Sequence, residues 1–127
     1  MVRRCLIVDD NEPFLAVARA TLQREGLDVV GTASTVAEAL DQADRLHPDV
    51  VLVDVSLGAE SGFELTRRLV ERHPDLRARV VLISTRREED YDDLIALSPA
   101  AGFVWKAQLS AAAVRDRLAG AQRAGGG

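Results

Sequence analysis

Two hydrophobic periods alternate along the chain. Five short apolar runs rich in β-branched residues are typical of strands: Cys5–Val8, Leu27–Val30, Val50–Val55, Val80–Ile83 and Phe103–Trp105. Between these runs, apolar residues recur three and four positions apart, as on one face of an amphipathic helix. The clearest such face carries Val36, Ala39, Leu40, Ala43 and Leu46. The pattern predicts five consecutive strand–helix units.

The strands predict a parallel sheet covered by helices on both faces. The run Val50–Val53 is apolar at every position, which is typical of a strand buried on both sides. Thr35 with Glu38, and Ser61 with Glu64, have the spacing of a capping box and mark two helix starts. With right-handed crossovers, we expect a doubly wound α/β fold with strand order 2-1-3-4-5.

Length and composition fit one cytoplasmic domain. The chain has 127 residues, 47% of them hydrophobic, and we expect a single domain over 1–121 followed by a flexible tail or linker over 122–127. The net charge of −4 excludes the strongly basic class of nucleic-acid binders. Cys5 is the only cysteine, so neither an intramolecular disulfide nor a cysteine zinc site can form. No apolar run is long enough to cross a membrane.

Three carboxylates follow two strands that are neighbours in the expected order. The first strand ends in Asp9 and Asp10, and the third ends in Asp54. Ligands of open α/β sheets bind at the carboxyl ends of the strands, where the order reverses, so these side chains should meet there. Crowded carboxylates repel one another, and a divalent cation removes that cost. A set of oxygen ligands leaving room for phosphate favours Mg²⁺.

The remaining strand ends supply groups that suit a phosphate. Ser84 ends the fourth strand, and Lys106, the one lysine among 16 basic residues, follows the fifth. An ammonium group binds phosphate as a compact point charge, and a hydroxyl can donate to a phosphoryl oxygen. With Asp54 as nucleophile, these groups predict a phosphoryl-transfer site that acts by positioning and electrostatics.

Several motifs together resemble the receiver domains of bacterial two-component response regulators. They are Leu6–Asn11, Val51–Asp54, Gly62, Val81–Ser84 and Gly102–Lys106, and the resemblance covers residues 3–121. It implies a flavodoxin-like three-layer sandwich. It also implies that a sensor histidine kinase or phosphotransfer protein passes a phosphoryl group to Asp54. The domain would then catalyse only its own phosphorylation and dephosphorylation and would not be an enzyme otherwise.

The resemblance also implies a set of metal ligands. Asp10 and Asp54 would bind Mg²⁺ directly, the backbone carbonyl of Ser56 would complete the protein ligands, and Asp9 would act mainly through water. Nothing in the motifs implies any other cofactor.

A switch is implied as well. Ser84 and Lys106 would hold the phosphate, and Ser84 and Phe103 would form a switch pair whose ring turns inward. This would reshape the face of the fourth helix, the strand at Phe103–Trp105 and the fifth helix, for a downstream protein, an output domain or a second copy of the chain. This segment would bind neither nucleic acid nor membrane. We expect Trp105 to be buried under the last helix, and the run Glu88–Asp90 to open the fourth.

Three alternatives remain open on the sequence. A degenerate receiver would bind proteins without being phosphorylated, but the complete acid trio argues against it. A small phosphatase of the haloacid-dehalogenase type shares the nucleophile, metal, hydroxyl and lysine, but it places its nucleophile after the first strand and usually adds a cap. A flavin-binding protein would need hydroxyls and amides where the carboxylates stand.

Overall fold

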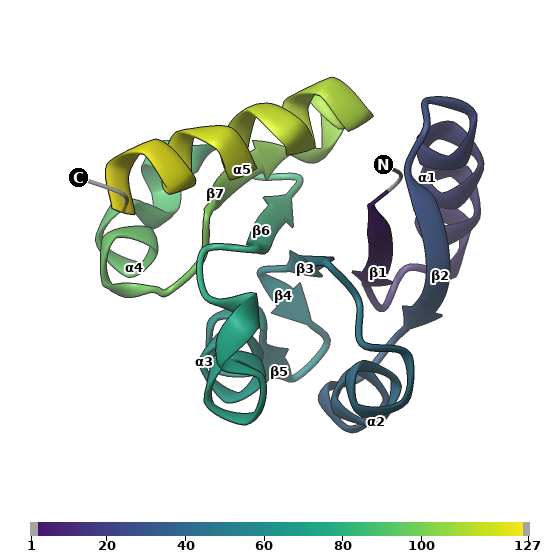
Figure 1. Ribbon diagram of the computed structural model, residues 1–127, viewed down its shortest axis with the longest axis horizontal. Helices are drawn as coiled ribbons and strands as arrows, with labels where there is room; N and C mark the ends of the chain where they lie inside the picture. The colour runs from purple at the N-terminus through teal and green to yellow at the C-terminus, as the bar shows by residue number, and fades with distance from the viewer. Residues whose placement is uncertain (1–2, 126–127) are drawn as a thin grey trace.

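The computed structural model describes residues 3–125, and its centre is a five-stranded parallel sheet (Figure 1). The strands are β1 (Arg4–Val8), β2 (Asp28–Ala33), β3 (Val50–Asp54), β6 (Val80–Ser84) and β7 (Gly102–Trp105). Their order is β2-β1-β3-β6-β7. This is the predicted 2-1-3-4-5 arrangement, because β6 and β7 are the fourth and fifth predicted strands.

Helices cover both faces of the sheet. They are α1 (Glu12–Arg24), α2 (Val36–Leu46), α3 (Gly62–Arg72), α4 (Asp92–Leu97) and α5 (Ala111–Gly125). Figure 1 shows α1 and α5 on one face, with α2 and α3 on the other. Residues of α1 and α5 pack into one buried cluster, and residues of α2 and α3 pack into a second. The three-layer flavodoxin-like sandwich is therefore confirmed.

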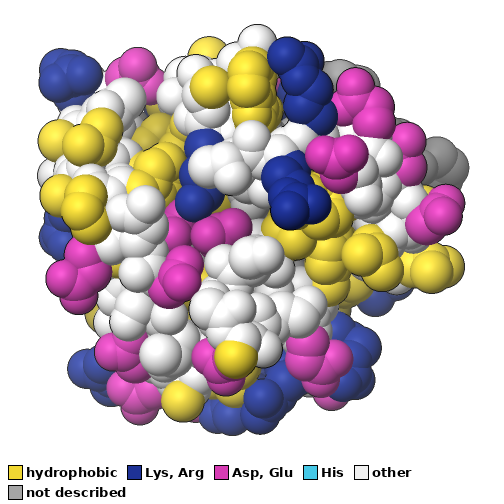
Figure 2. Space-filling view, turned by 180° about the vertical axis from the view of Figure 1, so that it is seen from behind, with side chains coloured by type: hydrophobic (Ala, Val, Ile, Leu, Met, Phe, Trp, Pro, Cys, Tyr) yellow, Lys and Arg dark blue, Asp and Glu magenta, His cyan; other side chains and the backbone are white. Residues whose placement is uncertain are grey.

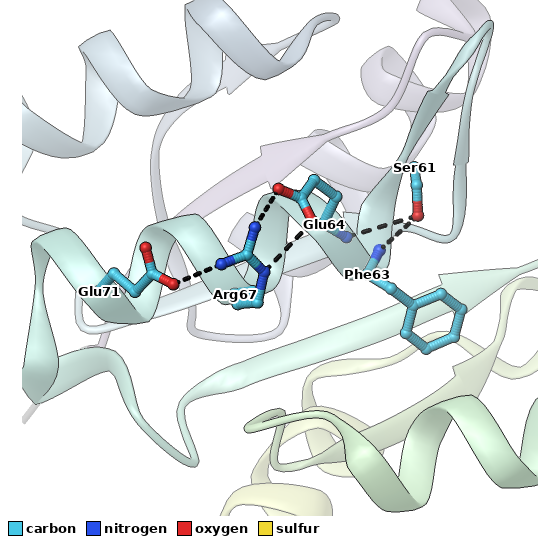
Figure 3. Close-up of polar contacts among 5 residues, drawn as sticks. All are labelled: Ser61, Phe63, Glu64, Arg67 and Glu71. Carbon is cyan, nitrogen blue, oxygen red and sulfur yellow. Dashed lines mark hydrogen bonds and ion pairs between the residues drawn. The ribbon is translucent and has the colours of Figure 1, made fainter.

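The predicted caps fix the starts of two helices. The Thr35 side chain accepts a hydrogen bond from the backbone N–H of Glu38 at the start of α2. At the start of α3, Ser61 Oγ accepts from the N–H groups of Phe63 and Glu64 (Figure 3). One turn further along α3, Arg67 pairs with Glu64 and Glu71 on the helix surface. These contacts lie within α3 and stabilise its first turns.

Three local features differ from the sequence analysis. The acidic run Glu88–Asp90 does not open α4: it lies in a 3-10 turn, η2 (Glu88–Tyr91), because Tyr91 leaves the helical region at ψ 12°. A small hairpin of β4 (Ser56–Leu57) and β5 (Glu60–Ser61) precedes α3. Gly58 turns that hairpin with φ +63°, a value that glycine adopts without strain. Helix α5 runs to Gly125, past the predicted domain end at residue 121.

The surface carries charges of both signs. In Figure 2, acidic side chains and uncharged surface separate the lysine and arginine side chains on the face in view. A continuous basic stripe, the usual footprint of a nucleic-acid binder, is not seen on that face. Within residues 3–125, no helix combines the length and apolar character that crossing a bilayer requires.

Candidate functional site

The carboxyl ends of the strands meet around one cleft of about 390 Å³. Asp9 follows β1, Asp54 and Ser84 end β3 and β6, and Lys106 follows β7. The cleft is lined by Asp9, Asp10, Asn11, Asp54, Ser56, Gly58, Ser84, Thr85, Arg86, Tyr91 and Lys106. It therefore brings together every predicted site residue except Phe103, as the strand order requires.

The acid trio is compact. Each of Asp9, Asp10 and Asp54 offers a carboxylate oxygen within 4.8 Å of the other two. Asp9 is fully buried, Asp54 is 7% exposed, and Asp10 is open to solvent. The trio thus extends from the interior of the domain to its surface, so that a ligand can reach it.

Lys106 supplies the positive charge at the inner end of the cleft. Its Nζ lies 2.6 Å from Asp9 Oδ2 and donates a 3.2 Å hydrogen bond to Asp54 Oδ2. It also lies 4.4 Å from the centre of the Phe14 ring, close enough for a cation–π contact. The contact between Lys106 Nζ and Asp9 Oδ2 is thus a short ion pair with a fully buried carboxylate.

The environment shifts the pKa values of two of these groups, Asp54 and Lys106. Burial, together with the negative charge of Asp9, raises the pKa of Asp54 to about 6, although the Ser56 N–H and Lys106 oppose the shift. Burial alone would lower the pKa of Lys106, but the hydrogen bond to Asp9 and the charges of Asp54 and Asp9 raise it above its ordinary value. At neutral pH the site thus holds an ammonium group beside a carboxylate that is costly to keep ionised.

Backbone N–H groups complete the local geometry. The N–H of Ser56 donates to Asp54 Oδ1 at 3.2 Å, and the N–H of Asn11 donates to Asp9 Oδ1 at 2.9 Å. Ser84 Oγ accepts from the N–H of Arg86 at 3.0 Å. The Oδ2 atoms of Asp9 and Asp54 both contact Lys106 Nζ. An oxygen-only donor set of three clustered carboxylates fits a hard divalent cation.

Of the two aromatic residues of β7, only Trp105 lies differently from the prediction. Phe103 does not line the cleft: it is buried and packs against Tyr91, 6.1 Å between ring centres, and its switch role stays a prediction. Trp105 is half-buried and lies on the α2 and α3 side of the sheet, so its predicted position under the last helix is wrong. Strand alternation explains this, because Val104 takes the position that faces α5.

Sequence reasoning missed Tyr91, which lines the cleft and contacts Phe103. The 3-10 turn that brings it there has no hydrophobic period to reveal it. A signal was present nonetheless, because Tyr91 is the only tyrosine in the chain and follows Ser84 by seven positions.

Comparison with known proteins identifies the family. The family model described as "Response regulator receiver domain" matches residues 5–118. The chain belongs to this family. A receiver domain is a phosphoacceptor signalling domain, as the sequence predicted, and the comparisons give no support to the phosphatase or to the unphosphorylated alternative.

Relatives of known name agree with this assignment. Response regulator GacA of Pseudomonas viridiflava is 36% identical over 81% of this receiver chain and 48% of its own length. The DNA-binding transcriptional activator DevR/DosR of Mycobacterium tuberculosis is 38% identical, over 81% of the chain and 47% of its own. The chain thus spans about half the length of these curated relatives.

A solved structure of a Burkholderia pseudomallei response regulator matches the same fold. It has a TM-score of 0.80 and 25% identity, with 98% of this chain and 71% of that chain covered. Its description records a phosphorylated aspartic acid, a calcium ion and citrate in that protein.

Proposed function

We propose that Asp54 of this receiver domain accepts a phosphoryl group from a sensor histidine kinase or phosphotransfer protein. The observation that carries the proposal is the contact of Lys106 with both Asp9 and Asp54 at the strand ends. A carboxylate nucleophile beside a fixed ammonium is the arrangement that phosphoryl transfer to aspartate needs. The phosphorylated aspartic acid in the Burkholderia protein supports the same chemistry.

In the transfer, an Asp54 carboxylate oxygen forms a bond to phosphorus while the bond from phosphorus to the donor breaks. The electron pair of that broken bond leaves with the donor. Lys106 and the Ser84 hydroxyl face the phosphoryl oxygens and offset their charge, because both line the cleft with Asp54. No residue needs to act as a general base, since Asp54 attacks in its ionised form.

Mg²⁺ is the proposed cofactor. Asp10, Asp54 and the backbone carbonyl of Ser56 would hold it directly, and Asp9 would hold it mainly through water. When bound, Mg²⁺ supplies positive charge between the carboxylates and the phosphoryl oxygens. The compact oxygen donor set supports this assignment.

The proposed output is a change in the face formed by α4, β7 and α5. Ser84 would move toward the phosphate, and Phe103, already buried here, would follow. The named relatives are longer proteins, and one is described as DNA-binding, which supports an attached output domain or a separate downstream protein as partner. A phosphorylation-dependent homodimer is the other outcome of this proposal.

The domain itself would catalyse only its own phosphorylation and dephosphorylation. A cytoplasmic location is proposed with it.

The test uses acetyl phosphate as a small phosphodonor with Mg²⁺, with intact-mass spectrometry as the readout. Wild type and an Asp41→Asn control, altered at an exposed ion pair on α2, should each gain one phosphoryl group. Asp54→Asn should gain none, and removal of Mg²⁺ with a chelator should abolish the gain in wild type and in Asp41→Asn. If wild type and Asp54→Asn behave alike, Asp54 is not the acceptor.

A further inference from the structure

The peptide unit between Thr85 and Arg86 is held at both ends. Its carbonyl oxygen accepts a 2.9 Å hydrogen bond from the indole N–H of Trp105. Its N–H donates a 3.0 Å hydrogen bond to Ser84 Oγ. Because a peptide unit is planar, its C=O and N–H keep a fixed relation and turn together. Trp105 and the Ser84 hydroxyl are therefore linked through one rigid plane.

Trp105 is itself fixed in place. Strand β7 pairs with β6 in a register that sets Trp105 opposite Ser84. The guanidinium carbon of Arg87 lies 4.6 Å from the centre of the indole ring, within range of a cation–π contact. Trp105 also immediately precedes Lys106 in the chain. It thus stands between the two residues that face the phosphoryl position.

The link matters for the direction of the Ser84 proton. While Ser84 Oγ accepts from the Arg86 N–H, one lone pair is occupied and the hydroxyl hydrogen stays free to donate elsewhere. Ser84 is buried at the inner wall of the cleft that contains Asp54. Loss of the bond from Trp105 frees the peptide plane to turn, and the Ser84 hydroxyl can then bond to nearby backbone groups instead.

We propose that Trp105 is a positioning residue that holds the Ser84 hydroxyl ready for a phosphoryl oxygen, acting through the Thr85–Arg86 peptide. This inference rests on the proposed function and identifies a contact that orients the Ser84 hydroxyl in the same site. It assigns a task to the indole N–H, which packing alone would not require in a half-buried ring.

The experiment is a double-mutant cycle on the phosphorylation rate constant, with acetyl phosphate and Mg²⁺. Trp105→Phe removes the donor and keeps an aromatic ring. Replacement of the single tryptophan by its benzothiophene analogue removes only the N–H and keeps the shape. Either change should slow phosphorylation about three- to fivefold, as expected for one hydrogen bond. In a Ser84→Ala background, neither change should slow it further.

Melting temperatures separate this effect from misfolding, and the benzothiophene protein decides the result if Trp105→Phe proves unstable. An equal slowing in the Ser84→Ala background overturns the inference, because Trp105 would then act by another route. The inference is also overturned if neither change at Trp105 slows phosphorylation when Ser84 is intact. Absence of phosphorylation in the wild type is a separate result, which rejects the proposed function itself.

Discussion

Lys106 Nζ lies 2.6 Å from Asp9 Oδ2, and this pair is enclosed more deeply than any other contact of the site. The Asp9 carboxylate is fully buried, while the Lys106 side chain is 11% exposed. A buried carboxylate with no cation beside it is strongly destabilising, so Lys106 stabilises the fold as well as facing the phosphoryl position. Any bound divalent cation would share this charge-compensating role.

Lys106→Met should therefore destabilise the protein in a metal-dependent way. In chelator, we expect the free energy of unfolding to fall by about 3 kcal/mol, because the change leaves buried carboxylate charge without its partner. Saturating Mg²⁺ should restore much of the loss, and phosphorylation should slow at least about tenfold even then. Urea unfolding with and without Mg²⁺ measures the loss of stability. Intact-mass kinetics measure the slowing of phosphorylation.

Arg45→Met is the matched control, because its partner Asp41 is exposed. It should change the free energy of unfolding by less than about 1 kcal/mol, and Mg²⁺ should not alter that change. An equal loss for Lys106→Met with and without Mg²⁺ would contradict the shared role of the lysine and the metal.

The raised pKa of Asp54 predicts that the stability of the metal-free protein depends on pH. Its pKa is raised from 3.8 to about 6, so the folded state binds the proton more tightly than the unfolded chain. Ionisation of Asp54 therefore lowers the free energy of unfolding as the pH rises from about 4 to about 6, and the loss persists above that range. Asp54→Asn should be more stable than wild type at pH 8, by about 1–2 kcal/mol, and the gain should vanish near pH 4.

Chemical unfolding of both proteins across this pH range, in chelator, measures the difference. Asp41→Asn is the control, because it removes a carboxylate from an exposed ion pair outside the cleft. A stabilisation by Asp54→Asn that grew toward acid pH would contradict the predicted sign.

The sequence predicted what strand order dictates, and it missed what depends on side-chain geometry. The meeting of Asp9, Asp54 and Lys106 followed from placing each residue at a strand end, because parallel strands present their carboxyl ends at one edge. The direct ion pair between Asp9 and Lys106 could not be foreseen, since it is set by distances of a few ångströms. The position of Tyr91 depends on a 3-10 turn. The position of Trp105 depends on which helices pack against each face of β7.

Gly62 fixes the distance between α3 and the end of β3. A Cβ at this position would lie 2.0 Å from the carbonyl oxygen of Asp54, and that oxygen belongs to the backbone and cannot turn aside. Gly62→Ala should therefore destabilise the protein by about 3 kcal/mol through overpacking. It should also slow phosphorylation, because relief of the clash displaces Asp54. Denaturant unfolding and the acetyl phosphate assay measure the two effects.

Gly58→Ala gives the comparison for a glycine with a different role. Its Cβ would make only an ordinary van der Waals contact with Asp10 Oδ2, at 3.7 Å, but its φ of +63° strains any L-residue. The cost should be about 1–2 kcal/mol, below that of Gly62→Ala. The reverse order of the two costs would mean that α3 can move away from β3 without loss.

Tyr91 joins the cleft to the buried ring of Phe103. Its ring centre lies 6.0 Å from that of Phe63 and 6.1 Å from that of Phe103, within the range of aromatic pairs. Tyr91→Leu removes both pairs and should lower the free energy of unfolding by about 1–2 kcal/mol. Tyr91→Phe keeps both rings in contact and should change it by less than about 0.5 kcal/mol. Equal losses in the two variants would place the contribution in the hydroxyl group, because the ring contacts survive in Tyr91→Phe.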